Sequence, residues 1–257
     1  MVLNIAHRGG AGLAPENTLS CFEQGIIFAD MVEFDVQPSK DSQLMVYHDR
    51  NGIERTTNGK GKVPDLTFDY LRSLDAGSWF DQKFKGEKIP TLSEVLERIS
   101  STNIQYNIEL KYYNPKSSWF EDEIISFVKN FRIEDKTVIT TRYVENIIRL
   151  KEIDPTIDCA LLQKERTPNE YFKLLLELDL NTAQIRSSAL EPSFLNICHE
   201  KGIRVFYFYA DEPDKMKKVI NLGVDGILTN YPDRLKQILA KEFEESSSAL
   251  EELHGKF

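Results

Sequence analysis

The stretch from Asn4 to Ile26, NIAHRGGAGLAPENTLSCFEQGI, decides how the fold is interpreted. It begins with a short apolar run, turns through a histidine, an arginine and two glycines, and continues into a segment with helical spacing. A buried strand that leads into a helix is the repeating unit of parallel α/β proteins. Because His7 and Arg8 close the strand and flexible glycines follow, this strand end is suited to receive an anion.

The same alternation of β-branched runs and helical patterns continues along the chain, which is typical of parallel βαβ units. Eight strands are expected, at residues 2–6, 31–36, 104–110, 137–141, 157–162, 182–185, 203–209 and 225–229. Helices are expected near residues 18–29, 91–100, 117–131, 143–153, 168–178, 193–201, 213–222 and 231–242. Eight of each in 257 residues predicts the α/β class and a closed (β/α)8 TIM barrel, rather than an open doubly wound sheet.

Two segments depart from this rhythm. Residues 51–88 are too long for an ordinary loop after a strand, and an extra short strand at 43–47 precedes them. We interpret residues 51–88 as a small insertion after the second strand. The sequence is equally compatible with an active-site lid and with a purely structural flap. Residues 1–242 then form a single catalytic barrel that includes the insertion, and residues 243–257 a polar C-terminal tail.

Composition narrows the function classes. The chain has 32 basic and 41 acidic residues, a net charge of −9, which disfavours nucleic-acid binding. No apolar run reaches the roughly 18 residues of a membrane span. Three widely spaced cysteines indicate reduced core thiols, and the first residues do not resemble a signal peptide, so a cytoplasmic protein is expected. The sequence leaves the oligomeric state open, a homodimer included.

Charged residues gather at the ends of the first three barrel strands, where TIM barrels carry their active sites. Glu33 and Asp35 are two positions apart on one strand, and Glu109 and Lys111 are two apart on the next. Two buried carboxylates side by side need a cation between them. With Glu109 they form an all-oxygen ligand set suited to one Mg²⁺ or Ca²⁺. The alternative is a set of salt bridges to Arg8 and Lys111 without a metal.

Two histidines lie close to this carboxylate cluster along the strands. His7 ends the first strand, and His48 follows the short run at 43–47. Cleavage of a phosphodiester needs one group that takes a proton from the attacking hydroxyl and another that protonates the leaving alkoxide. His7 and His48 are candidates for these two roles, whereas His199 and His254 are expected to be ordinary surface residues.

In combination, these motifs resemble the glycerophosphodiester phosphodiesterase family. The motifs are AHRG, PENT, EFDVQPSKD, LMVYHD, IELK and GVDGILTNYPD, and the similarity runs from residue 3 to about 235. The resemblance implies a (β/α)8 barrel with a small insertion, a bound divalent cation, and hydrolysis of glycerophosphodiesters. Glycerophosphocholine and glycerophosphoethanolamine would be such substrates, and sn-glycerol 3-phosphate and an alcohol the products.

The resemblance also implies roles for individual residues. His7 and His48 match the catalytic acid/base pair, and Glu33, Asp35 and Glu109 match the metal ligands. Substrate-binding roles fall to Arg8, Glu16, Lys111 and Phe208, with Glu16 facing the site. Asn17 is expected to fix the loop as a helix N-cap.

One departure from the family pattern affects substrate preference. The family commonly has Trp-Thr-Val-Asn at the end of the seventh barrel strand, and this chain has Phe208-Tyr-Ala-Asp211. Two alternatives therefore stay open beside the main interpretation. One is a lysophospholipase D-like or related phospholipid phosphodiesterase on the same barrel, and the other is a catalytically silent barrel that binds glycerol phosphate.

Overall fold

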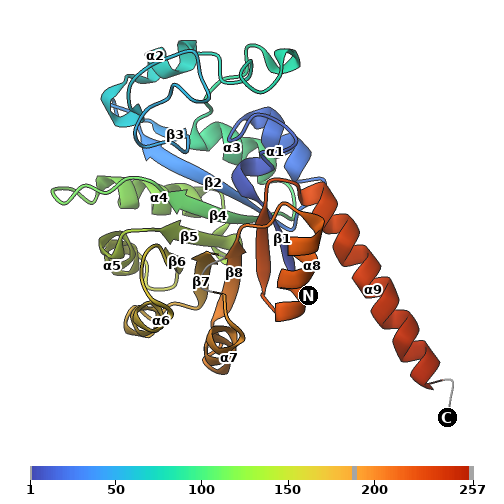
Figure 1. Ribbon diagram of the computed structural model, residues 1–257. Helices are drawn as coiled ribbons and strands as arrows, with labels where there is room; N and C mark the ends of the chain where they lie inside the picture. Colours follow the sequence, from blue (N-terminus) through green and yellow to red (C-terminus); the bar gives the residue numbers. More distant parts are fainter. Residues whose placement is uncertain (1, 187–189, 255–257) are drawn as a thin grey trace.

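A computed structural model describes residues 2–186 and 190–254, and its strands close into a barrel (Figure 1). Eight parallel strands of this described part pair in the order β1-β2-β4-β5-β6-β7-β8-β9 and back to β1. The short strand β3 pairs antiparallel with the end of β2. The strands are β1 (Leu3–Ala6), β2 (Met31–Pro38), β3 (Leu44–Val46), β4 (Gln105–Leu110), β5 (Thr137–Thr141), β6 (Asp158–Leu162), β7 (Thr182–Arg186), β8 (Arg204–Phe208) and β9 (Gly226–Thr229). The predicted TIM barrel is confirmed.

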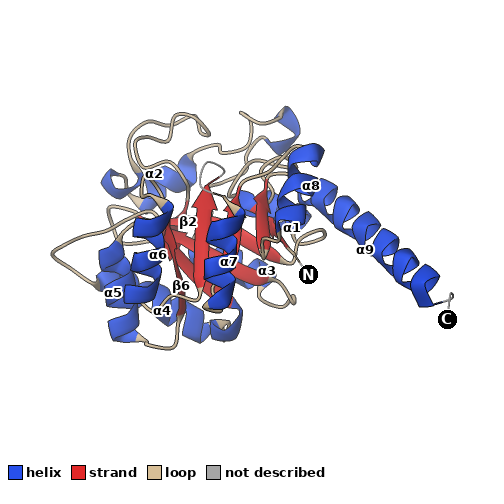
Figure 2. Ribbon diagram, turned by 60° about the horizontal axis from the view of Figure 1, so that its bottom comes forward, coloured by secondary structure: helices blue, strands red, loops and turns tan. Residues whose placement is uncertain are grey.

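Helices cover the outside of this barrel, as Figure 2 shows. The α-helices of the described residues, including α2 of the insertion, are α1 (Leu19–Gly25), α2 (Phe68–Ser73), α3 (Leu92–Ile99), α4 (Trp119–Asn130), α5 (Val144–Ile153), α6 (Pro168–Glu177), α7 (Pro192–Glu200), α8 (Pro213–Leu222) and α9 (Pro232–His254). Within the described residues, no helix is both long and apolar enough to cross a bilayer.

The last helix corrects one expectation. A helix was predicted to end near residue 242 and to give way to a polar tail, but α9 continues to His254 and projects away from the barrel (Figure 1). Residues 241–254 include five glutamates and two leucines, and both residue types are strong helix formers. Polarity alone therefore gave the wrong end for this helix.

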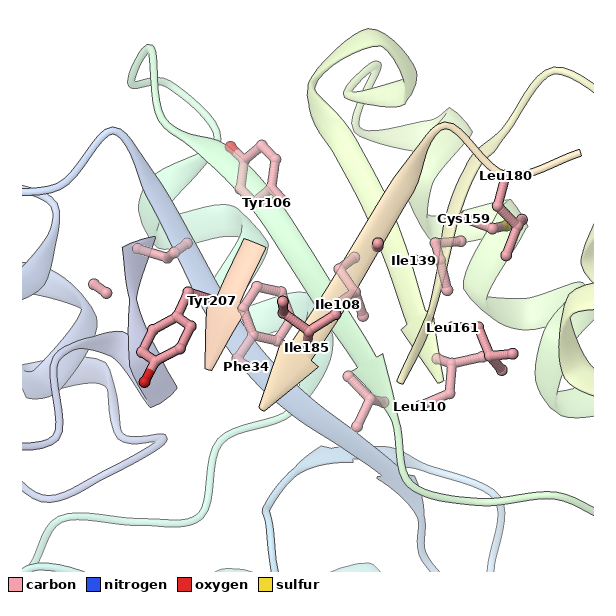
Figure 3. Close-up of a cluster of buried hydrophobic side chains, with 14 of the residues drawn as sticks. Phe34, Tyr106, Ile108, Leu110, Ile139, Cys159, Leu161, Leu180, Ile185 and Tyr207 are labelled. Carbon is pink, nitrogen blue, oxygen red and sulfur yellow. The ribbon is translucent and has the colours of Figure 1, made fainter. Parts of the chain in front are cut away.

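Apolar side chains pack against both faces of the barrel strands, outside and inside the barrel. The outer layer lies between strands and helices, and Figure 3 shows part of it, including Phe34, Ile108, Ile139, Leu161, Ile185 and Tyr207. A smaller cluster fills the barrel itself and consists of Ile5, Met31, Val138, Ala160, Phe206 and Leu228. Ile5 and Met31 each lie two residues before an inward polar residue, His7 and Glu33. The interior is therefore apolar toward the N-terminal ends of the strands and polar toward their C-terminal ends.

Local capping fits the sequence at one helix and differs at another. Thr91 and Glu94 form the capping box that precedes α3. At α1 the N-cap is Thr18, whose side chain accepts a hydrogen bond from the backbone N–H of Cys21. The prediction that Asn17 caps this helix is wrong, because the Asn17 side chain turns inward to Asp35 instead.

The insertion folds over its own small core. Residues between β3 and α3 form the 3-10 turns Val63–Asp65 and Gln82–Phe84 and the helix α2. Eight buried side chains of this region pack together, namely Met45, Tyr47, Ile53, Val63, Leu71, Leu74, Ala76 and Ile89. The insertion lies beside β3 at one end of the barrel (Figure 1). Cys21, Cys159 and Cys198 are buried and unbridged, as expected.

Candidate active site

Three carboxylates meet inside the barrel at the C-terminal ends of β2 and β4. Asp35 and Glu109 are directly paired in the parallel register of these two strands, and Glu33 lies two residues before Asp35 on the same face. One oxygen from each carboxylate lies within 4.8 Å of the others, and all three residues are buried. The sequence prediction that these residues come together is confirmed by the geometry.

Two cationic side chains, Lys111 and Arg8, lie next to this carboxylate cluster. Lys111 Nζ lies 2.8 Å from Asp35 Oδ1 and donates to Glu109 Oε1. Arg8 Nε lies 3.7 Å from Asp35 Oδ2. Burial by itself raises the pKa of the Asp35 carboxyl, but Lys111, His48 and Arg8 together hold it below its usual range. The salt bridges expected in the alternative without a metal are therefore present.

Glu33 differs from its two neighbours because, among the described residues, only the His7 ring lies at ion-pair distance from it. Its Oε2 accepts a hydrogen bond of 2.9 Å from the backbone N–H of Arg8, and its buried Oε1 has no hydrogen-bond partner among the described residues. Burial, followed by repulsion from Asp35 and Glu109, raises the pKa of Glu33 well above its usual value. An unsatisfied buried oxygen in this position is a free ligand atom.

The three oxygens fit one hard cation. Ligands that sit about 2.0–2.6 Å from a common Mg²⁺ or Ca²⁺ are at most about 5 Å apart, and the oxygens of the cluster meet that limit. Carboxylate oxygens suit these ions, and the cluster contains no sulfur ligand that would favour a softer metal. The cluster can therefore hold a divalent cation, once Lys111 shifts away from Glu109.

His7 is fixed by a chain of hydrogen bonds from the last two barrel strands. Its Nδ1 is 2.7 Å from Asn230 Oδ1, and the Asn230 amide group donates at 2.7 Å to Asp211 Oδ2. Asp211 also accepts from the backbone N–H of Asn230 and from Thr229. A carboxylate only accepts, so the amide nitrogen of Asn230 faces Asp211 and its oxygen faces His7.

This arrangement sets the protonation of the His7 ring. Because the Asn230 oxygen accepts, Nδ1 of His7 carries the proton and Nε2 keeps its lone pair in the neutral ring. Nε2 lies 3.9 Å from Glu33 Oε2. Burial and the nearby Arg8 charge lower the pKa of His7 to about 3, so the ring is neutral at pH 7.

His48 is held by a second carboxylate from the loop after β3. Its Nδ1 lies 2.5 Å from Asp49 Oδ1, and Arg55 of the insertion donates to Asp49 Oδ2 at 2.6 Å. Arg55 also bonds Glu16, which in turn accepts from Arg8 Nη1 at 2.9 Å. The insertion thus contributes to the site through Arg55, whose hydrogen bonds orient the carboxylates of Asp49 and Glu16.

Two adjoining cavities open at this end of the barrel. A cavity of about 90 Å³ is bordered by His7, Arg8, His48, Glu109 and Lys111, together with Phe208. The Phe208 ring meets the His7 ring edge-on with 5.1 Å between centroids. A larger cavity of about 630 Å³ shares His48, Glu109 and Lys111 as part of its wall. Of the predicted site residues, Glu16, Glu33 and Asp35 border neither cavity, and Glu16 pairs with Arg8 and Arg55 instead.

Sequence reasoning did not assign four residues that support the site. Asn17 donates at 2.8 Å to Asp35, and Arg55 orients Asp49. Asn230 and Asp211 fix His7. Asn230 directly follows the end of β9, so the rule that polar residues after barrel strands belong to the site would have found it. Asn17 belongs to the PENT motif, whereas no local signal marks Arg55, because it reaches the site across the fold.

Comparison with known proteins agrees with this geometry. A model of the "Glycerophosphoryl diester phosphodiesterase family" matches residues 7–234. The chain belongs to the glycerophosphoryl diester phosphodiesterase family. It is therefore an enzyme family member, as the sequence resemblance predicted. The match includes the two histidines and the three carboxylates of the site.

Relatives in the glycerophosphoryl diester phosphodiesterase family cover almost the whole chain. A glycerophosphodiester phosphodiesterase of Caldanaerobacter subterraneus is 34% identical over 247 residues, which is 93% of this chain and 98% of the relative. An Oleispira antarctica phosphodiesterase, solved in complex with the product sn-glycerol-3-phosphate, superposes with a TM-score of 0.84 at 27% identity, over 92% of this chain and 96% of the other. An Agrobacterium tumefaciens glycerophosphodiester phosphodiesterase gives a TM-score of 0.80 at 26% identity, over 92% and 100%.

Proposed function

We propose that this protein hydrolyses small, water-soluble glycerophosphodiesters to sn-glycerol 3-phosphate and an alcohol, with one divalent cation and two histidines. The observation that carries this proposal is the common cavity of about 90 Å³, which His7, His48 and Arg8 border together with Glu109 of the carboxylate cluster. Names of relatives in the same family, and the product bound in the Oleispira structure, support it.

In this proposal Glu33, Asp35 and Glu109 hold the Mg²⁺ or Ca²⁺ ion. When bound, the ion supplies Lewis-acid stabilisation of negative charge on the phosphoryl oxygens. Arg8 contributes its guanidinium to the same oxygens, and Glu16 holds that guanidinium in place. Lys111, released from Glu109, provides a further positive charge at the cavity wall.

The two histidines divide the proton transfers. His7 enters the reaction neutral, with the Nε2 lone pair directed toward the carboxylate cluster, and is suited to take the proton of the attacking hydroxyl. As the phosphorus–oxygen bond to the alcohol breaks, His48 gives a proton to the leaving oxygen. Asp49 accepts from Nδ1 of His48 throughout, which keeps Nε2 available for this transfer. The attacking hydroxyl belongs to water or to the glycerol 2-position.

The cavity lining favours a water-soluble diester over a lysophospholipid. Every residue that borders the cavity of about 630 Å³ is charged, polar or glycine. An acyl chain bound in this cavity would contact no apolar side chain, so the hydrophobic effect would not stabilise its binding. The lysophospholipase D-like alternative therefore has less support from this structure, and the presence of both histidines and all three carboxylates argues against a silent binding barrel.

The barrel of residues 1–242 is the catalytic unit in this proposal, and the part of α9 that follows residue 242 has no catalytic role. A cytoplasmic location and a homodimer stay predictions.

Release of sn-glycerol 3-phosphate, measured by a coupled dehydrogenase assay, tests the proposed reaction. Purified protein is incubated with glycerophosphoinositol or glycerophosphocholine, in the presence of Mg²⁺ or Ca²⁺ and after chelation. We expect turnover with a metal and loss of turnover on chelation. His7→Ala and His48→Ala should abolish turnover, while His199→Ala, on exposed α7, should retain it. Absence of product with every substrate and ion would refute the proposal.

Calorimetric titration tests the metal ligands without relying on activity. Glu33→Gln keeps the shape of the side chain but removes one anionic ligand, so we expect its affinity for Mg²⁺ or Ca²⁺ to fall by at least tenfold. His48→Ala serves as the matched control, because His48 is not a ligand in this proposal and its variant should bind the ion normally. Unchanged affinity in Glu33→Gln would show that the ligand assignment is wrong.

A further inference from the structure

Three cations lie at the C-terminal ends of consecutive barrel strands. Arg142 directly follows β5, Lys164 follows β6 by two residues, and Arg186 is the last residue of β7. These strands are parallel neighbours, so their ends lie at one edge. All three side chains border the cavity of about 630 Å³. We call Arg142, Lys164 and Arg186 the basic rim.

Carboxylates of Asp49, Glu54 and Glu109 border the same cavity, but among the described residues none of them forms an ion pair with the basic rim. Of the other arginines and lysines around the same cavity, Arg50 donates a hydrogen bond to the Tyr143 hydroxyl, and the remaining two form ion pairs. Arg55 pairs with Glu16 and Asp49, and Lys111 pairs with Asp35 and Glu109. Among residues 2–186 and 190–254, no carboxylate forms an ion pair with a member of the basic rim.

The basic rim is distinguished by its location, because its three cations border one cavity beside the catalytic residues. The chain as a whole carries a charge of −9, so acidic side chains to neutralise the rim are not scarce. Burial, and then the positive charge of Arg142, lower the pKa of the Lys164 ammonium to about 8. The like charges thus repel one another in the free protein, and an anion bound between them would remove that repulsion.

The basic rim is within reach of a substrate bound at the catalytic residues. Lys164 and Arg186 border the small cavity of about 90 Å³ together with His7 and His48, and they also border the large one. The small cavity matches one compact part of a diester rather than both halves. The large cavity falls in the range of about 300–1,000 Å³ that is typical of ligand pockets. With glycerol phosphate in the small cavity, the alcohol half extends along the rim.

We propose that the enzyme prefers glycerophosphodiesters whose alcohol half carries a further phosphate group, which Arg142, Lys164 and Arg186 bind. This inference rests on the proposed function and narrows its substrate class. Two guanidinium groups can each donate paired hydrogen bonds to phosphate oxygens, and the lysine adds a point charge. A choline or ethanolamine group carries a positive charge and would be repelled by the same rim, so glycerophosphocholine is expected to be a poorer substrate.

The test compares two substrates that differ by one phosphate. We measure kcat/KM for glycerophosphoinositol 4-phosphate and for glycerophosphoinositol with the metal-loaded, full-length protein. The expected ratio for the unmodified enzyme is at least ten in favour of the phosphorylated substrate, and it should shrink as salt screens the rim. In Arg142→Gln/Arg186→Gln the ratio should fall to about one. Because both substrates share the same catalytic centre, the ratio is insensitive to a general loss of activity.

A matched control removes the same charge elsewhere. Lys217 and Lys218 on α8 are exposed and border none of the cavities that the basic rim lines. The double variant Lys217→Gln/Lys218→Gln should keep the ratio of the unmodified enzyme. If both inositol substrates are hydrolysed with a ratio near one, the inference is overturned and the proposed function stands. If no glycerophosphodiester yields product, the proposed function fails, and this inference fails with it.

Discussion

Replacement of Lys111 by methionine tests the charge balance of the carboxylate cluster. The ammonium lies 2.8 Å from Asp35 Oδ1 and also contacts Glu109, and the side chain of Asp35 is only 1% exposed. At an effective dielectric constant of 20, two unit charges at this distance attract each other by about 6 kcal/mol. Part of this is offset by the cost of burying the ammonium. Removal of one partner from a buried ion pair typically costs about 3–5 kcal/mol. We expect Lys111→Met to lower the free energy of unfolding of the metal-free protein by that amount.

Urea unfolding at pH 7, with a chelator and then with saturating Mg²⁺ or Ca²⁺, measures this effect. In the unmodified protein the divalent ion must displace Lys111 from the carboxylates, whereas in Lys111→Met no cation competes. We therefore expect the ion to bind the variant at least tenfold more tightly, which corresponds to about 1.4 kcal/mol more stabilisation at a given saturating concentration. The variant should thus be the less stable protein without metal and should gain more from metal.

An exposed lysine gives the matched control. Lys173 pairs with Glu177 at 3.5 Å on the surface of α6, with 78% of its side chain exposed. Exposed pairs contribute about 0–1 kcal/mol, so Lys173→Met should have little effect. A cost below about 1 kcal/mol for Lys111→Met, equal to that of the control, would refute the reasoning, and so would a smaller metal effect in Lys111→Met than in the unmodified protein.

Three further predictions follow from the same contacts. Burial raises the pKa of Glu33, and a bound ion needs the ionised carboxylate, so metal affinity should rise with pH by about tenfold per pH unit until the pH passes that pKa. Calorimetry at several pH values measures this rise, which should be absent in Glu33→Gln. Asp211→Ala leaves the Asn230 amide free to turn, so kcat should fall by about ten- to a hundredfold with little change in KM; equal changes in both would contradict a positioning role. Phe34→Ala empties a site in the outer apolar layer and should lower the free energy of unfolding by about 3–5 kcal/mol in a denaturant titration, and a cost below 1 kcal/mol would show that the layer repacks there.

Much of the fold was predictable because the relevant signals are local. Strand and helix periodicity, together with punctuation such as the Thr91 capping box, place most elements close to where the structure has them. The exceptions also have local causes. Asn17 has the right residue type for an N-cap, but a hydrogen bond to Asp35 engages its side chain, and Thr18 takes the cap instead. At α9, the helix continues to His254 instead of ending near residue 242, because the polar residues there are also good helix formers.

The sequence by itself determined which residues meet at the barrel mouth. Once eight parallel strands are placed, the residues at their ends share one face, and strand alternation puts Glu33, Asp35 and Glu109 on the inside. Because side chains alternate between the two faces of a strand, the position of each residue in the strand predicts whether it faces the barrel interior, without any coordinates.

Only the tertiary structure decided how those residues are protonated, oriented and paired. The tautomer and orientation of His7 depend on Asn230 and Asp211, more than 200 residues away along the chain, and the orientation of His48 depends on Arg55 of the insertion. The unpaired state of the basic rim likewise depends on which carboxylates reach the mouth across the fold. Charge and hydrogen bonding act over a few ångströms in space, whatever the separation in sequence, and such distances exist only after the barrel has closed.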